Sequence, residues 1–186
     1  MNILHLDSNH PLLIEQLSAL GHINHEDYFS TKEAVQTKIH LYDGIIIRSR
    51  FRIDSTFLAK AINLKFIGRV GAGLENIDCD YAEEKGVLCV HAAGNSSIDI
   101  GKEPNYPSPK YPSMSKEFSN WIEVGASTRY KKAKADKKNG GFKQPGLAAR
   151  FSNYNNDMVD VFAPGLELYP PTSIILSPFK SPNVIP

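Results

Sequence analysis

A short apolar run, Gly44-Ile45-Ile46-Ile47, lies in the first half of the chain and is followed at once by charged and polar residues. None of its four positions is polar. A strand with one exposed face alternates apolar and polar side chains, whereas a strand covered by helices on both faces is apolar throughout. The run therefore predicts a central strand of a parallel sheet.

Similar apolar runs stand on both sides of it, and helix-like stretches separate them. We expect the other strands at Ile3 to Leu6, Ile23 to Tyr28, Phe66 to Arg69 and Val87 to Val90. We expect helices over Pro11 to Leu20, after a cap at Asp54, and over Tyr81 to Lys85, where Asp80 is the cap and Gly86 the end. This rhythm predicts an α/β fold, a flavodoxin-like parallel sheet with flanking helices.

The sequence changes character after Asn95. Prolines and glycines crowd residues 101–112, which predicts a long surface loop. Three further strands are expected at Trp121 to Ala126, Ala148 to Phe151 and Val159 to Phe162, and a weaker one at Ile174 to Leu176 in the Pro-rich tail.

Composition excludes several classes of protein. The chain has 21 Lys and Arg against 20 Asp and Glu, so no overall charge favours nucleic acid or an anionic membrane. A lysine-rich stretch, residues 131–138, could be a nucleic-acid patch, but the interposed Asp136 favours a solvated loop. Two cysteines are too few for a disulfide framework, no metal site is indicated, and no secretory signal or membrane span is visible. We expect a cytoplasmic protein.

Residues 43–50 and 64–78 together carry a family resemblance. They read Asp-Gly-Ile-Ile-Ile-Arg-Ser-Arg and then Leu-Lys-Phe-Ile-Gly-Arg-Val-Gly-Ala-Gly-Leu-Glu-Asn-Ile-Asp. This text resembles the first domain of D-isomer-specific 2-hydroxyacid dehydrogenases of the phosphoglycerate dehydrogenase type. The resemblance extends from Met1 to about Val90.

The turn Gly71-Ala72-Gly73 lets backbone N–H groups approach a ligand closely, which suits a carboxylate. The resemblance implies that role in substrate binding, with Arg48 and Ser49 lining the same cleft. From the residues alone, a tight strand-to-loop turn of purely structural use is the favoured explanation of Gly71 and Gly73. The turn is not a dinucleotide fingerprint, because Asn76 stands where the third glycine would be.

Four later blocks resemble subtilisin-like serine proteases and occur in that family's order. They are residues 87–95, 120–126, 151–154 and 159–165. The resemblance implies a partial subtilisin-like α/β sheet in the second half. It also implies that Asn95 corresponds to the family's oxyanion-hole asparagine, although an Asn after Gly94 is also an ordinary turn residue.

Neither resemblance brings a full catalytic set. In the dehydrogenases the nicotinamide domain and the catalytic Arg, Glu and His follow the point where this sequence leaves the pattern, so we expect no cofactor here, although NAD serves the full-length family. In the subtilases the catalytic Asp and His precede these blocks, and in this chain the corresponding residues are dehydrogenase-like sequence. His91 reads as a buried or solvated histidine, and Ser173 and Ser177 have no adjacent base.

The dehydrogenase-like and subtilase-like sequences meet within residues 81–88. This stretch, a helix end, a glycine and the start of a parallel strand, is compatible with either family. We assign residues 1–90 to a dehydrogenase substrate-domain fragment, 86–169 to a subtilase fragment and 170–186 to an unassigned tail. Because the strand Val87 to Val90 belongs to a parallel sheet in both families, the later strands could add beside it and extend one sheet.

Four functions are consistent with this sequence. The first is a chimeric protein without catalysis, and the second is a module that binds a small 2-hydroxy or 2-keto acid without turnover. The third is an enzyme subunit completed by another chain. The fourth, nucleic-acid binding by the lysines of residues 131–138, is the least favoured.

Overall fold

A computed structural model describes residues 1–102, 104–105, 119–127, 148–149, 151–155 and 158–164. The strands are β1 (Asn2–His5), β2 (Ile23–Glu26), β3 (Gly44–Ile47), β4 (Phe66–Ala72), β5 (Leu88–Ala92), β6 (Trp121–Ser127) and β7 (Val161–Pro164). The helices are α1 (Pro11–Ala19), α2 (Lys32–Lys38), α3 (Ser55–Lys60) and α4 (Cys79–Glu84), with a short 3-10 turn η1 (Ile39–Leu41).

All seven strands form one parallel sheet in the order β2-β1-β3-β4-β5-β6-β7. The first five follow the flavodoxin-like order, in which the chain first winds to one side of β1 and then to the other. All four residues of β3 are buried in the middle of this sheet, as their uninterrupted apolar run predicts. The expected α/β class is confirmed.

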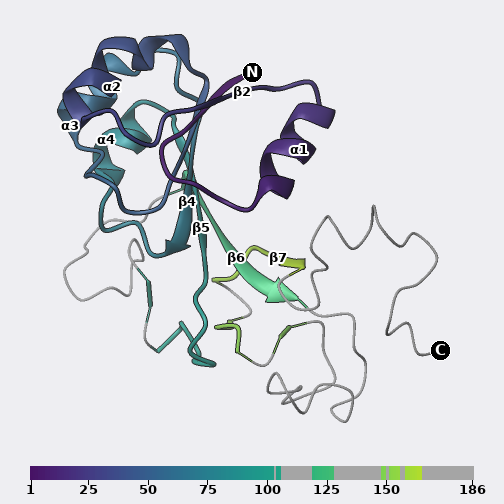
Figure 1. Ribbon diagram of the computed structural model, residues 1–186. Helices are drawn as coiled ribbons and strands as arrows, with labels where there is room; N and C mark the ends of the chain where they lie inside the picture. Colours follow the sequence, from purple (N-terminus) through teal and green to yellow (C-terminus); the bar gives the residue numbers. More distant parts are fainter. Residues whose placement is uncertain (103, 106–118, 128–147, 150, 156–157, 165–186) are drawn as a thin grey trace, which may run out of the picture.

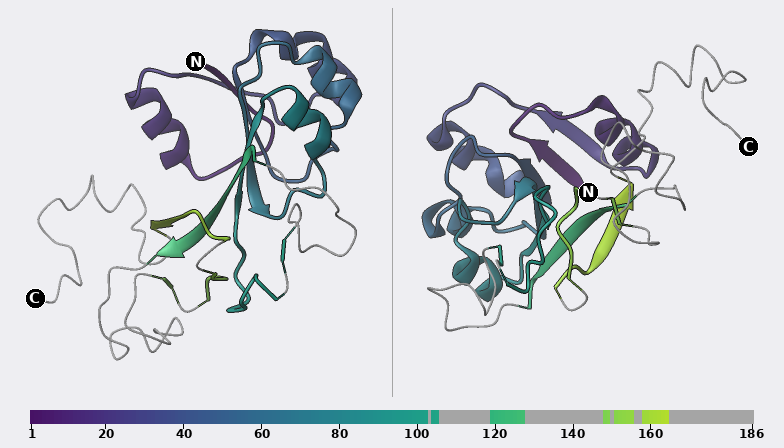
Figure 2. Two further views of the ribbon diagram at one scale, coloured as in Figure 1. Left: turned by 180° about the vertical axis from the view of Figure 1, so that it is seen from behind. Right: turned by 90° about the horizontal axis from the view of Figure 1, so that it is seen from below.

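Helices cover the two faces of the sheet unequally. Figure 1 shows α2, α3 and α4 together on one side and α1 alone on the other, and the view from behind in Figure 2 shows the same division. The main core lies under the three helices and includes Leu4, Ile45, Ile47, Ile67 and Phe57. The alternate residues of the same strands face α1, which has no fully buried residue.

Strand β5 joins the two halves of the sheet. Its residues pair with β4 through Phe66↔Leu88 to Gly68↔Val90 and with β6 through Cys89↔Trp121 to Ala92↔Val124. The expectation that the later strands extend the first sheet is therefore confirmed for β6 and β7. Cys89, in the middle of β5, is a buried free thiol, and burial raises its pKa to about 12.

Three helix expectations need correction. Helix α2 was not expected; Thr31 caps it by accepting a hydrogen bond from the Ala34 amide, and only Val35 in it is buried. The cap of α4 is Asp78 rather than Asp80, because the Asp78 carboxylate accepts from the Tyr81 amide at 3.1 Å. The apolar stripe of α1 ends before Leu20, which is exposed.

Two strand expectations also change. No strand covers Ala148 to Phe151 among the residues described there; Ala148 makes a single antiparallel bridge to Ser127, and Phe151 is in a turn. The last strand starts at Val161 instead of Val159, because Val159 bonds back to Asn155 and only Asp160 reaches β6. The lysine-rich stretch, the strand expected at 174–176 and the tail lie outside the described residues, as does most of the Pro-rich loop.

None of the helices among the described residues is both long and apolar enough to cross a membrane.

The cap of α4 provides a stability test with a matched control. We expect Asp78→Ala to lower the free energy of unfolding by about 1 kcal/mol, because the Tyr81 amide loses its partner. Asp80→Ala removes the same charge from the first turn without removing that bond, so a loss of a few tenths of a kcal/mol is expected. Urea denaturation measures both; equal losses would contradict the assignment of the cap.

Candidate functional site

The residues assigned to substrate binding lie at the carboxyl ends of two neighbouring strands. Arg48 and Ser49 follow β3 directly and are exposed, and Gly71 and Ala72 end β4, with Gly73 next in the chain. Carboxyl ends of adjacent parallel strands meet at one edge of a sheet, which is where ligands of open α/β sheets bind. The structure therefore brings Arg48, Ser49 and the glycine turn to one edge.

Local contacts already engage parts of this edge. The Arg48 amide donates to the Asp7 carboxylate at 2.6 Å, and its guanidinium donates to the Ser8 carbonyl at 3.4 Å. Gly73 has a φ of +71°, a left-handed conformation that favours glycine, and its amide donates to Nδ1 of His91 at 3.2 Å. This amide therefore holds the turn to β5.

The glycine turn does not fit the pyrophosphate of NAD. Space beside Gly71 is filled by the Arg69 guanidinium, which also donates to the Ala72 carbonyl, and space beside Gly73 is filled by the Glu75 carboxylate. A dinucleotide needs open backbone N–H groups at this point, and here the Gly73 amide is already bonded to Nδ1 of His91. No step of chemistry through NAD follows from these residues.

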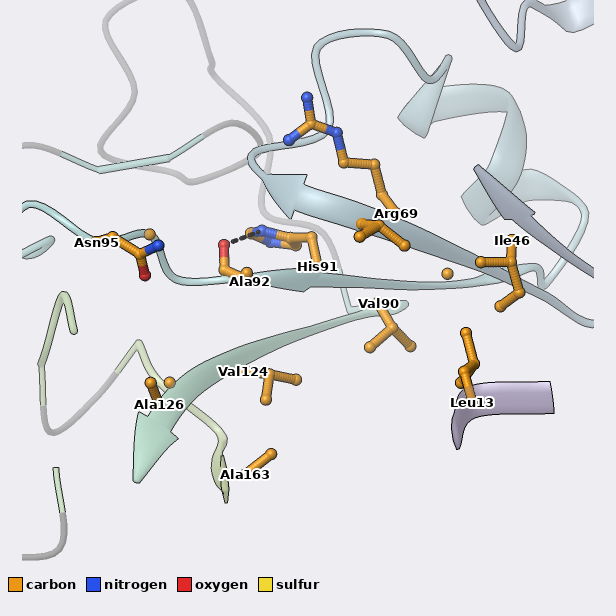
Figure 3. A pocket seen from close by; sticks show the side chains of 14 residues that line it. Leu13, Ile46, Arg69, Val90, His91, Ala92, Asn95, Val124, Ala126 and Ala163 are labelled. Atoms are coloured by element: carbon orange, nitrogen blue, oxygen red, sulfur yellow. Dashed lines mark hydrogen bonds between the residues drawn. The ribbon is translucent and has the colours of Figure 1, made fainter. Parts of the chain in front are cut away.

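A pocket of about 350 Å³ lies along the α1 side of the sheet, where no helix of the described residues covers the later strands. Its apolar wall includes Leu13, Ile46, Val90, Val124 and Ala163. Figure 3 shows these side chains directed to one side of the sheet and the side chains of Arg69 and His91 directed to the other. The pocket is thus apolar along most of its length, with the Asn95 amide near one end.

The turn that carries Asn95 is held by the side chain of Asn153, which is buried. Its Oδ1 accepts from the amides of Ser96 at 2.9 Å and Ile98 at 3.3 Å, and its Nδ2 donates to the Ala93 carbonyl at 2.7 Å. Gly94 has a φ of +99°, and a side chain there would collide with the Asn153 amide. Asn153 thus fixes the backbone on both sides of Asn95.

A second polar group lies on the opposite face, where His91 and Glu123 are both buried. Burial lowers the pKa of His91 to about 4, and the Arg69 charge lowers it further, against a backbone hydrogen bond and Asp160. Burial also raises the pKa of Glu123 to about 7, against a hydrogen bond from Asn105 and with help from the Asp160 charge. Both side chains are therefore largely uncharged in mildly acidic solution.

Sequence reasoning missed the roles of Asn153 and Glu123. Glu123 lies in the subtilase-like block 120–126 and Asn153 in the block 151–154. The sequence of these blocks does not show which of their polar side chains is buried. The available signal was a lone acid in an apolar run, Trp121-Ile122-Glu123-Val124. His91 was expected to be either buried or solvated, and the structure shows it buried.

Comparison with known proteins gives two family matches. The model of the D-isomer specific 2-hydroxyacid dehydrogenase catalytic domain matches residues 3–101, just over half of the chain. The model of the Subtilase family matches residues 58–181, about two thirds of it, and overlaps the first match over residues 58–101. The chain belongs to both families. In both matches β5 lies inside the matched residues.

Individual dehydrogenases are similar to the same part of the chain. D-3-phosphoglycerate dehydrogenase of Methanocaldococcus jannaschii is 35% identical over 102 residues, 55% of this chain and 19% of that protein. The enzyme of the same name from Archaeoglobus fulgidus is 35% identical over 72 residues, 39% of this chain and 14% of that protein. The NAD+-bound 3-phosphoglycerate dehydrogenase of Entamoeba histolytica has 26% identity and a TM-score of 0.45, covering 50% of this chain and 33% of that one.

The chain therefore spans less than a fifth of the length of the two curated phosphoglycerate dehydrogenases. The substrate-binding role of the glycine turn with Arg48 and Ser49, and the oxyanion-hole role of Asn95, stay predictions.

The Asn153 side chain gives a test of how the Asn95 turn is built. We expect Asn153→Ala to lower the free energy of unfolding by roughly 1–3 kcal/mol, because two amides and a carbonyl lose a buried partner. Amide hydrogen exchange should accelerate at Ser96 and Ile98. The control is Asn63→Ala, which removes an exposed amide bonded to the His40 carbonyl. Unchanged exchange at Ser96 would contradict the role given to Asn153.

Proposed function

We propose that this chain is a fusion of dehydrogenase and subtilase segments that catalyses neither parent reaction by itself. The segments are those assigned from the sequence, residues 1–90 and 86–169, followed by the tail 170–186. The observation that carries the proposal is the pairing of β5 with β4 on one side and β6 on the other. One continuous sheet passes from one family to the other.

The place of this join bears on catalysis. Beyond β5 a 2-hydroxyacid dehydrogenase would continue toward its nicotinamide domain, and here the sheet continues with the subtilase-like β6 and β7. A subtilase would carry its catalytic Asp and His upstream of the subtilase-like blocks, and here residues 3–57 match the dehydrogenase model alone while residues 58–101 match both models. Each segment occupies the place where the other family's catalytic residues are expected. Hydride transfer needs the cofactor's domain, and a serine nucleophile needs its base.

Two assays of the purified chain test this proposal. We expect no NAD-dependent oxidation of 3-phosphoglycerate and no hydrolysis of casein, with circular dichroism showing that the assayed protein is folded. A full-length phosphoglycerate dehydrogenase and a subtilisin serve as positive controls. Turnover in either assay by the chain alone would overturn the proposal, and activity that arises only on mixing with a full-length dehydrogenase would favour a subunit completed by another chain.

A second candidate function is the binding of a small 2-hydroxy or 2-keto acid without turnover. The specific observation in its favour is the edge shared by Arg48, Ser49 and the turn Gly71-Ala72-Gly73. Arg48 is exposed, and a guanidinium matches a carboxylate or phosphate in shape and charge. The names of the two curated relatives indicate an acid of this class, 3-phosphoglycerate.

Calorimetric titration with 3-phosphoglycerate and with 2-oxoglutarate tests the binding candidate. We expect saturable binding at millimolar ligand and an affinity at least about tenfold weaker in Arg48→Gln, because the charged partner of the carboxylate is lost. Arg52→Gln removes the same charge from another exposed residue and should bind as the unaltered chain does. No saturable heat, or equal loss in both variants, would reject the site.

A further inference from the structure

His91 and Glu123 are direct neighbours across the boundary between β5 and β6. They are Cα partners in the register of these parallel strands, so their side chains stand on the same face of the sheet. His91 is 2% exposed and Glu123 is 0% exposed. Two ionisable side chains are thus buried side by side where the later strands join the earlier ones.

Each of the two side chains has one polar atom that lacks a partner. Nδ1 of His91 lies 3.2 Å from the Gly73 amide and 3.1 Å from the Ala92 carbonyl, and Oε1 of Glu123 accepts from the Asn105 side chain. Within the described part of the chain, Nε2 of His91 and Oε2 of Glu123 have no hydrogen-bond partner. A buried charge without full partners is costly, so this arrangement favours the uncharged forms of both groups.

Several surrounding groups act in the same direction, whereas Asp160 and the backbone hydrogen bond to Ala92 favour a charged His91. Trp121 stacks on the imidazole with ring centroids 5.4 Å apart and excludes water from that side. Arg69 on β4 opposes a positive charge on His91, and Asp160 opposes a negative charge on Glu123. Asp160 is close in space because its carboxylate accepts from the Glu123 amide at 2.7 Å. Of these neighbours only the Asn105 amide favours the ionised carboxylate.

We propose that His91 and Glu123 form a proton-dependent lock between β5 and β6. The lock holds the later strands on the sheet while both side chains are uncharged, and it weakens as the Glu123 carboxyl loses its proton. The two strands at stake are β6 and β7, because β7 reaches the sheet only through β6. The device therefore links the attachment of the subtilase-like strands to pH.

The sign of the pH dependence follows from the two pKa values. Glu123 has a folded pKa of about 7, above its ordinary 4.5, so its contribution is fully present below 4.5 and is lost as pH rises through 7. His91 has a folded pKa of about 4, below its ordinary 6.5, so its contribution is fully present above 6.5 and is lost as pH falls through 4. Between 4.5 and 6.5 the two contributions oppose each other.

Melting temperatures measured from about pH 4 to about pH 8 test the lock. For the unaltered chain we expect a plateau in mildly acidic buffer and a fall as pH rises through 7. Glu123→Gln, which cannot ionise, should lose that fall. His91→Asn should lose the opposing contribution, so that its melting temperature falls from pH 4.5 to pH 7 and is level above that. Glu84→Gln, an exposed acid on α4, is the control and should keep the unaltered profile.

Hydrogen exchange on the unaltered chain provides a test that needs no variant to fold. After correction for the intrinsic pH dependence of exchange, protection of the β6 amides should drop as pH rises through 7 while protection of the β1 and β3 amides is kept. Two results would overturn the proposal. One is a Glu123→Gln profile identical to that of the unaltered chain, and the other is equal loss of protection in β6 and β1.

Discussion

Backbone hydrogen bonding along β5 is the constraint on which the rest of the structure depends. A strand inside a sheet must satisfy its N–H and C=O groups on both sides, and β5 does so with β4 on one edge and β6 on the other. Any segment that follows β4 here must therefore supply a strand of parallel direction and matching register. Residues Leu88–Ala92 lie inside both family matches, so this one strand is common to the dehydrogenase match and the subtilase match.

The two faces of the sheet are packed differently in the part of the chain that the structure describes. The face under α2, α3 and α4 keeps a continuous core as far as Trp121. Among the described residues the other face carries α1 as its one helix, and the apolar pocket along Ile46, Val90 and Val124 lies on that face. The turn around Asn95 is fixed by side-chain hydrogen bonds. Asn153, which lies later in the chain, accepts from the Ser96 amide and donates to the Ala93 carbonyl.

How much could be predicted from the sequence depends on what each residue's environment requires. The bounds of β3 are those expected, because an apolar run buried on both faces leaves no competing reading. Helix α2 was missed because its single buried residue, Val35, gives almost no apolar periodicity. Asp78 and Asp80 are both good capping residues, and the choice between them depends on where the chain leaves its extended conformation, which composition does not specify.

The candidate site divides in the same way. The dehydrogenase resemblance implied that Arg48 and the glycine turn line one cleft, and the pairing of β3 with β4 brings them to one edge of the sheet. The burial of Glu123 beside His91 does not follow from the sequence, because it depends on cover from Asn105 and on the register between strands far apart in the chain. The only sign of such long-range packing in the sequence is a single polar residue within an otherwise apolar strand.

The buried thiol of Cys89 has a practical consequence. Only a thiolate reacts readily with alkylating reagents, and this thiol is both inaccessible and held in its protonated form in the middle of β5. It becomes reactive when β5 separates from its neighbours. The chain thus contains its own chemical probe in the strand that joins the two halves of the sheet, and the rate at which Cys89 is labelled reports how often β5 separates from its neighbours.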